Sequence, residues 1–117
     1  MAWNHRENDG VVTLDMPVYL RSDEALDRFI QTIGALMDSG KCQIILDFRQ
    51  LALINSAGIA HLLRAAQDAR QRGGDIKVIC LKPAVRDLFL YTGIHTKIDI
   101  LSEEAEAVKR FQGITCQ

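Results

Sequence analysis

Hydrophobic and polar residues alternate along Val11–Asp15, which predicts a strand with one face toward a core. The Asn8-Asp9-Gly10 stretch before it is typical of a tight hairpin turn, because an Asp-Gly pair adopts the left-handed backbone that such turns need. A further strand is therefore expected before this turn, antiparallel to Val11–Asp15. Pro17 lacks a backbone N–H, so we do not expect a central strand to continue through it.

Apolar residues recur at intervals of three and four in four later segments, which predicts four helices. The segments begin with residues that favour helix N-termini, and glycines end the first three. The expected helices run from Ser22 to Gly40, from Asn55 or Ser56 to Gly73-Gly74, from Pro83 to Gly93, and from Ser102 onward. The residues expected to face inward are Leu26, Phe29, Ile30, Ile33, Leu36, Met37, Ile59, Leu62, Leu63, Ala66, Ala69, Val85, Leu88, Phe89, Tyr91, Ala105, Val108 and Phe111.

Two mostly apolar, β-branched runs, Cys42–Phe48 and Ile76–Leu81, are predicted to be strands buried on both faces. Ile98–Ile100 predicts a last, short strand. Strands that alternate with helices favour right-handed crossovers and a largely parallel sheet. We therefore expect an α/β fold in one domain over residues 1–117, with a mixed, mostly parallel sheet, an N-terminal antiparallel hairpin and about four helices.

The composition is that of an ordinary soluble globular protein. The 117 residues are 48% hydrophobic and 25% charged, and the net charge is −1. Acidic and basic residues are interspersed, which argues against a nucleic-acid or membrane-surface binder. The apolar runs are far shorter than the roughly 20 residues that span a bilayer, and the polar N-terminus has no signal-peptide pattern. Three widely spaced cysteines, Cys42, Cys80 and Cys116, favour free thiols in a reducing cytoplasm.

Known catalytic and cofactor motifs are absent from the sequence. There is no dinucleotide fingerprint, P-loop or nucleophile elbow. His5, His61 and His95 lie far apart along the chain and lack a metal-ligand spacing. We therefore expect no enzymatic activity, cofactor or metal site.

The segment from Asp47 to Ile59 is the most informative, because a strand leads through a short loop to Ser56 at the start of a helix. On the structural interpretation, Ser56 or Asn55 is simply the N-cap and accepts a bond from a free backbone N–H. On the functional interpretation, the same helix end tolerates a phosphate on Ser56. That phosphate would add nearly two negative charges and could abolish docking of a partner, which the small residues Ala57 and Gly58 would otherwise let approach closely. The two interpretations are compatible.

Several motifs in order resemble the STAS family, named after sulfate transporters and anti-sigma-factor antagonists. Ile54-Asn55-Ser56-Ala57-Gly58-Ile59, following Leu46-Asp47-Phe48, resembles the family's phosphorylation motif, Asp-Ser-(Ser/Ala)-Gly-(Leu/Ile). The similarity continues through Arg72-Gly73-Gly74, the run from Leu81 to Phe89, and Tyr91-Thr92-Gly93-Ile94. It covers Ile44 to Leu101 well and the first forty residues weakly.

The resemblance implies a cytoplasmic bacterial regulator of the anti-sigma-factor-antagonist type. In such a protein the unphosphorylated domain binds an anti-sigma factor that is itself a GHKL-type serine kinase. Phosphorylation of the serine that matches Ser56 breaks the complex, and a separate phosphatase resets it. The partner-binding surface then comprises Asn55, Ser56, Ala57, Gly58, Ile59, His61 and Tyr19. His61 is otherwise simply a partly exposed helix residue.

The sequence departs from the family pattern at two acidic positions. Asn55 stands in place of the motif's aspartate, and Tyr19 aligns with the aspartate of a Gly-Glu-Leu-Asp loop. Loss of both carboxylates favours an alternative, in which the domain is a scaffold subunit of a signalling assembly or an ABC transporter and is never phosphorylated. A third hypothesis is a small enzyme or small-molecule-binding domain with Ser56 as nucleophile, which the absence of an evident base or cofactor motif disfavours.

Overall fold

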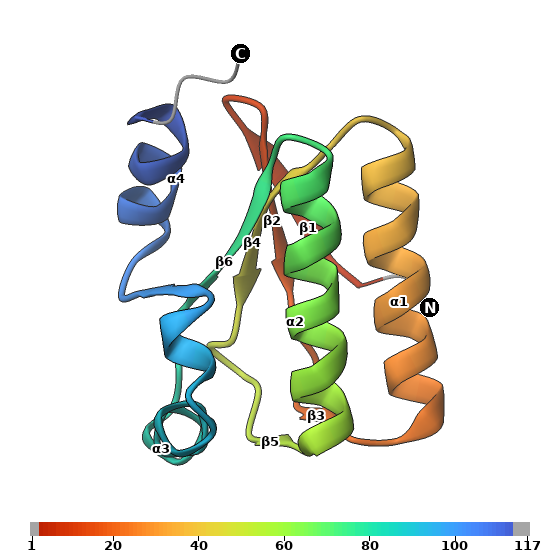
Figure 1. The fold of residues 1–117 in the computed structure, drawn as a ribbon, viewed down its shortest axis with the longest axis vertical. Coiled ribbons are helices and arrows are strands. Elements are labelled where there is room, and N and C mark those ends of the chain that lie inside the picture. Colours follow the sequence, from red (N-terminus) through yellow and green to blue (C-terminus); the bar gives the residue numbers. More distant parts are fainter. Residues whose placement is uncertain (1–2, 114–117) are drawn as a thin grey trace.

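The computed structural model describes residues 3–113, in which a five-stranded sheet is covered by helices on both faces (Figure 1). The strands of the main sheet are arranged in the order β1-β2-β4-β6-β7, and only β1 and β2 are antiparallel. The elements are β1 (His5–Asn8), β2 (Val11–Asp15), β3 (Tyr19–Leu20), α1 (Asp23–Asp38), β4 (Gln43–Asp47), β5 (Leu53–Ile54), α2 (Ser56–Gln71), β6 (Asp75–Ile79), α3 (Pro83–Thr92), a 3₁₀ turn (Ile94–Thr96), β7 (Asp99–Leu101) and α4 (Glu104–Gly113). The predicted fold class is confirmed.

The hairpin turn lies where the sequence places it. Asp9 and Gly10 have φ angles of 55° and 80°, the left-handed pair of a two-residue hairpin turn. The register of the hairpin pairs Asn8 with Val11 and His5 with Leu14.

Alternate residues of the central strand β4 build two apolar cores. Ile44 and Leu46 pack with the buried faces of α1, α2 and α3, and Ile45 packs on the opposite side with α4. On the larger core, the rings of Phe48 and Phe89 meet edge to face with centroids 5.7 Å apart. Burial on both faces explains why β4 is almost continuously apolar.

The helix ends follow the sequence signals except at the start of α4. Ser22 caps α1 by accepting a bond from the Ala25 N–H at 3.1 Å, and Pro83 is the first residue of α3. Tyr91 and Ile30, both expected to face inward, are 90% and 45% exposed. Helix α4 begins at Glu104, two residues after Ser102, and the Glu104 carboxylate accepts from Arg6 at 2.7 Å and from Thr13 at 2.8 Å. The alanine of α4 that packs inward is residue 107, whereas Ala105 is exposed.

The cysteines and the helix lengths also bear on the sequence signals. Cys42 and Cys80 are half-buried free thiols, and Cys116 lies outside the described residues. No helix within residues 3–113 is long and apolar enough to cross a membrane.

Two short strands that the hydrophobic pattern does not predict lie outside the main sheet. Strands β3 and β5 pair in parallel, with Tyr19 opposite Leu53 and Leu20 opposite Ile54. They lie beside the first turn of α2 (Figure 1). This small ladder joins the loop after β2 to the loop after β4, two segments more than 30 residues apart.

A buried lysine lies beneath α4. Lys77 on β6 is 1% exposed, and its ammonium contacts Asp99 at 2.8 Å and Asp75 at 3.4 Å. The Phe111 ring of α4 covers the ammonium at 4.8 Å from the ring centroid. The hydrogen bond from Lys77 holds the pKa of Asp99 below its usual value.

We expect Asp99→Asn to lower the free energy of unfolding by about 2 kcal/mol at pH 7, because Lys77 then loses its nearest anion. Since the folded pKa of Asp99 is lowered, its contribution is complete above the unfolded value near 3.9 and is lost as the pH falls further. The difference between wild type and variant should therefore narrow at pH 3. Urea unfolding at both pH values measures it. Asp87→Asn on α3 is the control, and an equal difference at both pH values would contradict this account.

Candidate functional site

The junction of β5 and α2 is organised by Asn55. This residue has extended backbone angles and is the N-cap of α2, its Oδ1 accepting a bond from the Gly58 N–H at 2.9 Å. Its carbonyl oxygen accepts from the Ile59 N–H at 3.1 Å. Of the two residues that the sequence leaves open as caps, Asn55 therefore fills the role, and Ser56 is the first residue of the helix.

The same side chain reaches across to the loop before α1. Asn55 Nδ2 donates to the carbonyl oxygen of Arg21 at 3.0 Å. One end of the amide faces a donor and the other faces an acceptor, which fixes its orientation. An ionised aspartate could accept from the Gly58 N–H but could not donate to Arg21, so asparagine makes a connection that an aspartate at this position cannot make.

Gly58 is buried at the point where α2 approaches β3. A Cβ atom at this position would lie 2.6 Å from Cγ1 of Ile54 and 2.9 Å from the carbonyl oxygen of Leu20. The missing side chain therefore serves internal packing. Gly58 is covered by its own chain, so its direct contact with a partner stays a prediction.

Three large apolar side chains lie exposed around this junction. Val18, Tyr19 and Leu53 are 43%, 51% and 45% exposed. The backbone of Val18 holds the loop after β4, since its carbonyl accepts from the Ala52 N–H at 2.8 Å. The guanidinium of Arg21 lies 5.0 Å from the centroid of the Tyr19 ring. We call the exposed group of Val18, Tyr19, Leu53, Asn55, Ser56 and Ala57 the junction surface.

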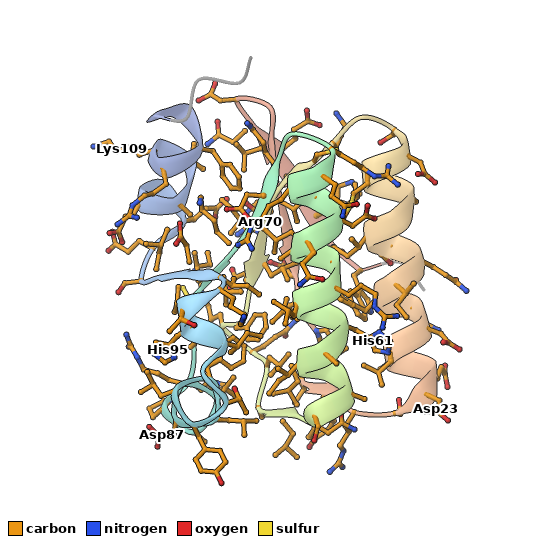
Figure 2. All side chains as sticks on the ribbon, viewed as in Figure 1. Asp23, His61, Arg70, Asp87, His95 and Lys109 are labelled. Atoms are coloured by element: carbon orange, nitrogen blue, oxygen red, sulfur yellow. The ribbon has the colours of Figure 1, made fainter. Side chains whose placement is uncertain are left out.

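The residues predicted as a binding surface divide into two groups. Tyr19, Asn55, Ser56 and Ala57 are exposed at the junction, whereas Ile59 is half-buried and Gly58 is buried. Figure 2 places His61 on the side of α2 that faces α1, where it lines a groove between the two helices. Sequence reasoning missed Val18, Leu53 and Arg21; the only available signal was the apolar character of two residues next to loop segments.

The electrostatics at the start of α2 favour an anion. The first turn contains no acidic residue, and the N–H groups of Ser56 and Ala57 point out of a helix end that offers them no intrahelical acceptor. The Ser56 side chain forms no hydrogen bond with another described residue. Within residues 3–113, no cluster of three or more His, Cys, Asp or Glu side chains could hold a metal ion.

Comparison with known proteins places these features in a family context. A family model described as the STAS domain matches residues 2–107. A Bordetella bronchiseptica protein named anti-sigma factor antagonist BtrV is 30% identical over 80 residues, which are 68% of this chain and 69% of that protein.

Solved structures share the fold at low sequence identity. An anti-sigma factor antagonist from Thermotoga maritima aligns with a TM-score of 0.85 and 18% identity over 94% of each chain. The anti-sigma factor antagonist SpoIIAA of Bacillus, in its unphosphorylated form, aligns with a TM-score of 0.78 and 21% identity over 97% of this chain and 99% of that chain.

We expect Asn55→Asp to lower the free energy of unfolding by about 1 kcal/mol at neutral pH, because it loses the donor to Arg21 while keeping the cap. Acidification to pH 3 should reduce this loss, since a protonated carboxyl can donate again. Ser22→Asp is the matched control, because Ser22 only accepts at its cap. Urea unfolding of the two variants would refute the bridging role of Asn55 if both behaved alike at each pH.

Gly58→Ala should destabilise the protein by about 2 kcal/mol, because the added methyl group overlaps Ile54 and the Leu20 backbone. Gly34→Ala in the middle of α1 is the control. A Cβ there meets nothing within 4 Å, so alanine's higher helix propensity should stabilise that variant by about 1 kcal/mol. Thermal unfolding of both variants measures the contrast, and a neutral Gly58→Ala would show that β3 can move away.

Proposed function

The chain belongs to the STAS domain family, and on that premise we propose that it is an anti-sigma factor antagonist whose junction surface binds an anti-sigma factor while Ser56 is unmodified. The partner is a serine kinase of the GHKL type, which phosphorylates Ser56 and is thereby released. A phosphatase restores the binding form. This cycle operates in the cytoplasm, and the domain acts by binding, without catalysis of its own.

The observation that carries the proposal is the setting of the Ser56 hydroxyl. It is exposed, forms no bond with another described residue, and lies on the same surface as the apolar side chains of Val18, Tyr19 and Leu53. A kinase could therefore reach the hydroxyl without unfolding the loop. A phosphate there would lie within the surface that a partner must desolvate.

The charge of one phosphate is large enough to switch binding. A phosphoserine carries about −1.5 to −2 charges at pH 7. In the free domain this charge faces water and the N-terminus of α2, which tolerates it. In a complex it would be pressed against apolar groups and lose its hydration, at a cost of several kcal/mol. Phosphorylation is thus expected to weaken the complex and leave the fold intact.

Family relatives supply further support. The Bordetella relative is named as an anti-sigma factor antagonist, and Bacillus SpoIIAA occurs in phosphorylated and unphosphorylated forms. Extending that behaviour to Ser56 of this chain is our inference.

A second candidate is a scaffold that docks permanently through the same surface, in a signalling assembly or an ABC transporter. The observation that favours it is Asn55 at the N-cap of α2, together with Tyr19 on the neighbouring ladder. The family pattern that the sequence resembles has aspartates at these two positions, so a kinase would meet a different surface.

Binding of co-purified proteins to Ser56→Ala and Ser56→Asp distinguishes the two candidates. For a switch, Ser56→Ala should hold the kinase within about threefold of wild type, and Ser56→Asp should bind at least 100-fold more weakly, which corresponds to about 2.7 kcal/mol. Mass spectrometry of proteins captured in the native host, with the Ser56 peptide read in parallel, is the measurement.

Ser102→Asp is the matched control, because Ser102 is also exposed but lies outside the junction surface. If all variants retain the same partners and Ser56 carries no phosphate, the switch is wrong and the scaffold takes its place.

A further inference from the structure

A groove runs between α1 and α2, away from the junction surface. It is open to solvent on one side and has a volume of about 180 Å³. Its floor is apolar, and its rim carries three polar side chains from α2. The residues that form the floor and one wall are Phe29, Ile30, Ile33, Gly34, Met37 and Ala65.

Gly34 keeps this groove open. It lies in the interior of α1, where its φ is not positive and where an added Cβ would meet nothing within 4 Å. Neither backbone conformation nor packing therefore requires glycine, although glycine weakens a helix relative to alanine. Ile30, one turn earlier on α1, is left 45% exposed at the same groove.

The polar rim carries one guanidinium and one carboxylate, of which only the carboxylate has an ion-pair partner among the described residues. Arg64 forms no ion pair or hydrogen bond with another described residue. The Asp68 carboxylate, which also lines the groove, is paired with Arg72 at 3.3 Å. His61 is the remaining polar side chain. A ligand with an anionic end would therefore find a free guanidinium beside an apolar floor.

We propose that this groove binds a short-chain amphipathic carboxylate, with its alkyl chain against Phe29, Ile33 and Gly34 and its carboxylate on Arg64. The volume suits such a ligand: a cavity of about 150 Å³ holds benzene, whereas drug-sized molecules occupy roughly 300–1,000 Å³. This inference does not depend on the function proposed for Ser56.

The surroundings of the groove favour a small ligand over a protein partner. A protein interface requires a broad contact area with an apolar centre. Among the described residues, Ile30 is the one exposed large apolar side chain at the groove; the others are Val18, Tyr19, Leu53, Leu90 and Tyr91, none of which lines it.

Octanoate is the probe, and Trp3 provides the signal. Trp3 is the chain's single tryptophan, and its ring lies 6.1 Å from that of Phe29, which lines the groove. Titration with octanoate should change Trp3 fluorescence saturably, with a Kd below about 1 mM. 1-Octanol has the same chain without the charge and should bind about tenfold more weakly.

Variants locate the site and test its two parts. Gly34→Leu should weaken octanoate binding at least tenfold by filling the groove, and Ala65→Leu should do the same from the α2 wall. Ala35→Leu is the matched control on the exposed side of α1 and should bind as wild type does. Arg64→Gln should weaken octanoate about tenfold and leave octanol within twofold.

Three outcomes would overturn the proposal. The first is the absence of saturable octanoate binding at concentrations up to tenfold above the expected Kd of about 1 mM. The second is unchanged octanoate binding in Gly34→Leu and Ala65→Leu, while thermal unfolding shows that both variants are folded. The third is that wild type binds no octanoate and Gly34→Leu sediments differently from wild type, which would assign the groove to contact between two copies of the chain.

Discussion

The arrangement of the functional end of this molecule depends on the side-chain amide of Asn55. One amide caps α2 through Gly58 and simultaneously holds the Arg21 carbonyl of the loop before α1. These two loops follow different strands of the sheet, and the amide adds a side-chain connection to the backbone bonds of the β3–β5 ladder. The β3–β5 ladder and the close approach at Gly58 lie on either side of the amide. All three contacts join the same two loops. Loosening one of them should therefore make Tyr19, Leu53 and Ser56 less firmly held together.

The sheet determines which apolar residues are buried and which remain exposed. Strand β4 is buried on both faces, so its apolar residues stabilise the fold and offer nothing to a partner. The loops at the ends of β2 and β4 are not covered by helices on both sides, and their apolar side chains Val18, Tyr19 and Leu53 remain exposed. Burying such a surface becomes costly when a phosphate is added to it, and the proposed switch at Ser56 rests on that cost.

The sequence predicts the repeating parts of this structure and misses the parts that depend on contacts across the fold. Strands β2, β4 and β6 and the four helices have periodic or continuous apolar patterns, so they are recognised locally. Strands β3 and β5 have two residues each, too few for any period, and form only because their loops meet. Tyr91 is misplaced because helical spacing alone does not fix the width of a buried face. The sequence also could not decide between Asn55 and Ser56 as cap, since the choice depends on the Arg21 carbonyl, which lies 34 positions away.

An asparagine rather than an aspartate at position 55 changes the electrostatic contrast between the two proposed states. With an aspartate at this position, the junction would carry a negative charge before any modification, and a partner would have to pair or desolvate that charge. Here the cap is neutral, and the neighbouring Tyr19 adds a ring that the Arg21 guanidinium covers. In the proposed complex a partner therefore meets a largely apolar surface beside the Arg21 guanidinium, and the negative charge would arrive with the phosphate. Asn55 supplies both the cap and the bridge, so a neutral side chain fulfils both structural roles. In the proposed switch this neutral cap would sharpen the difference between the bound and the released form.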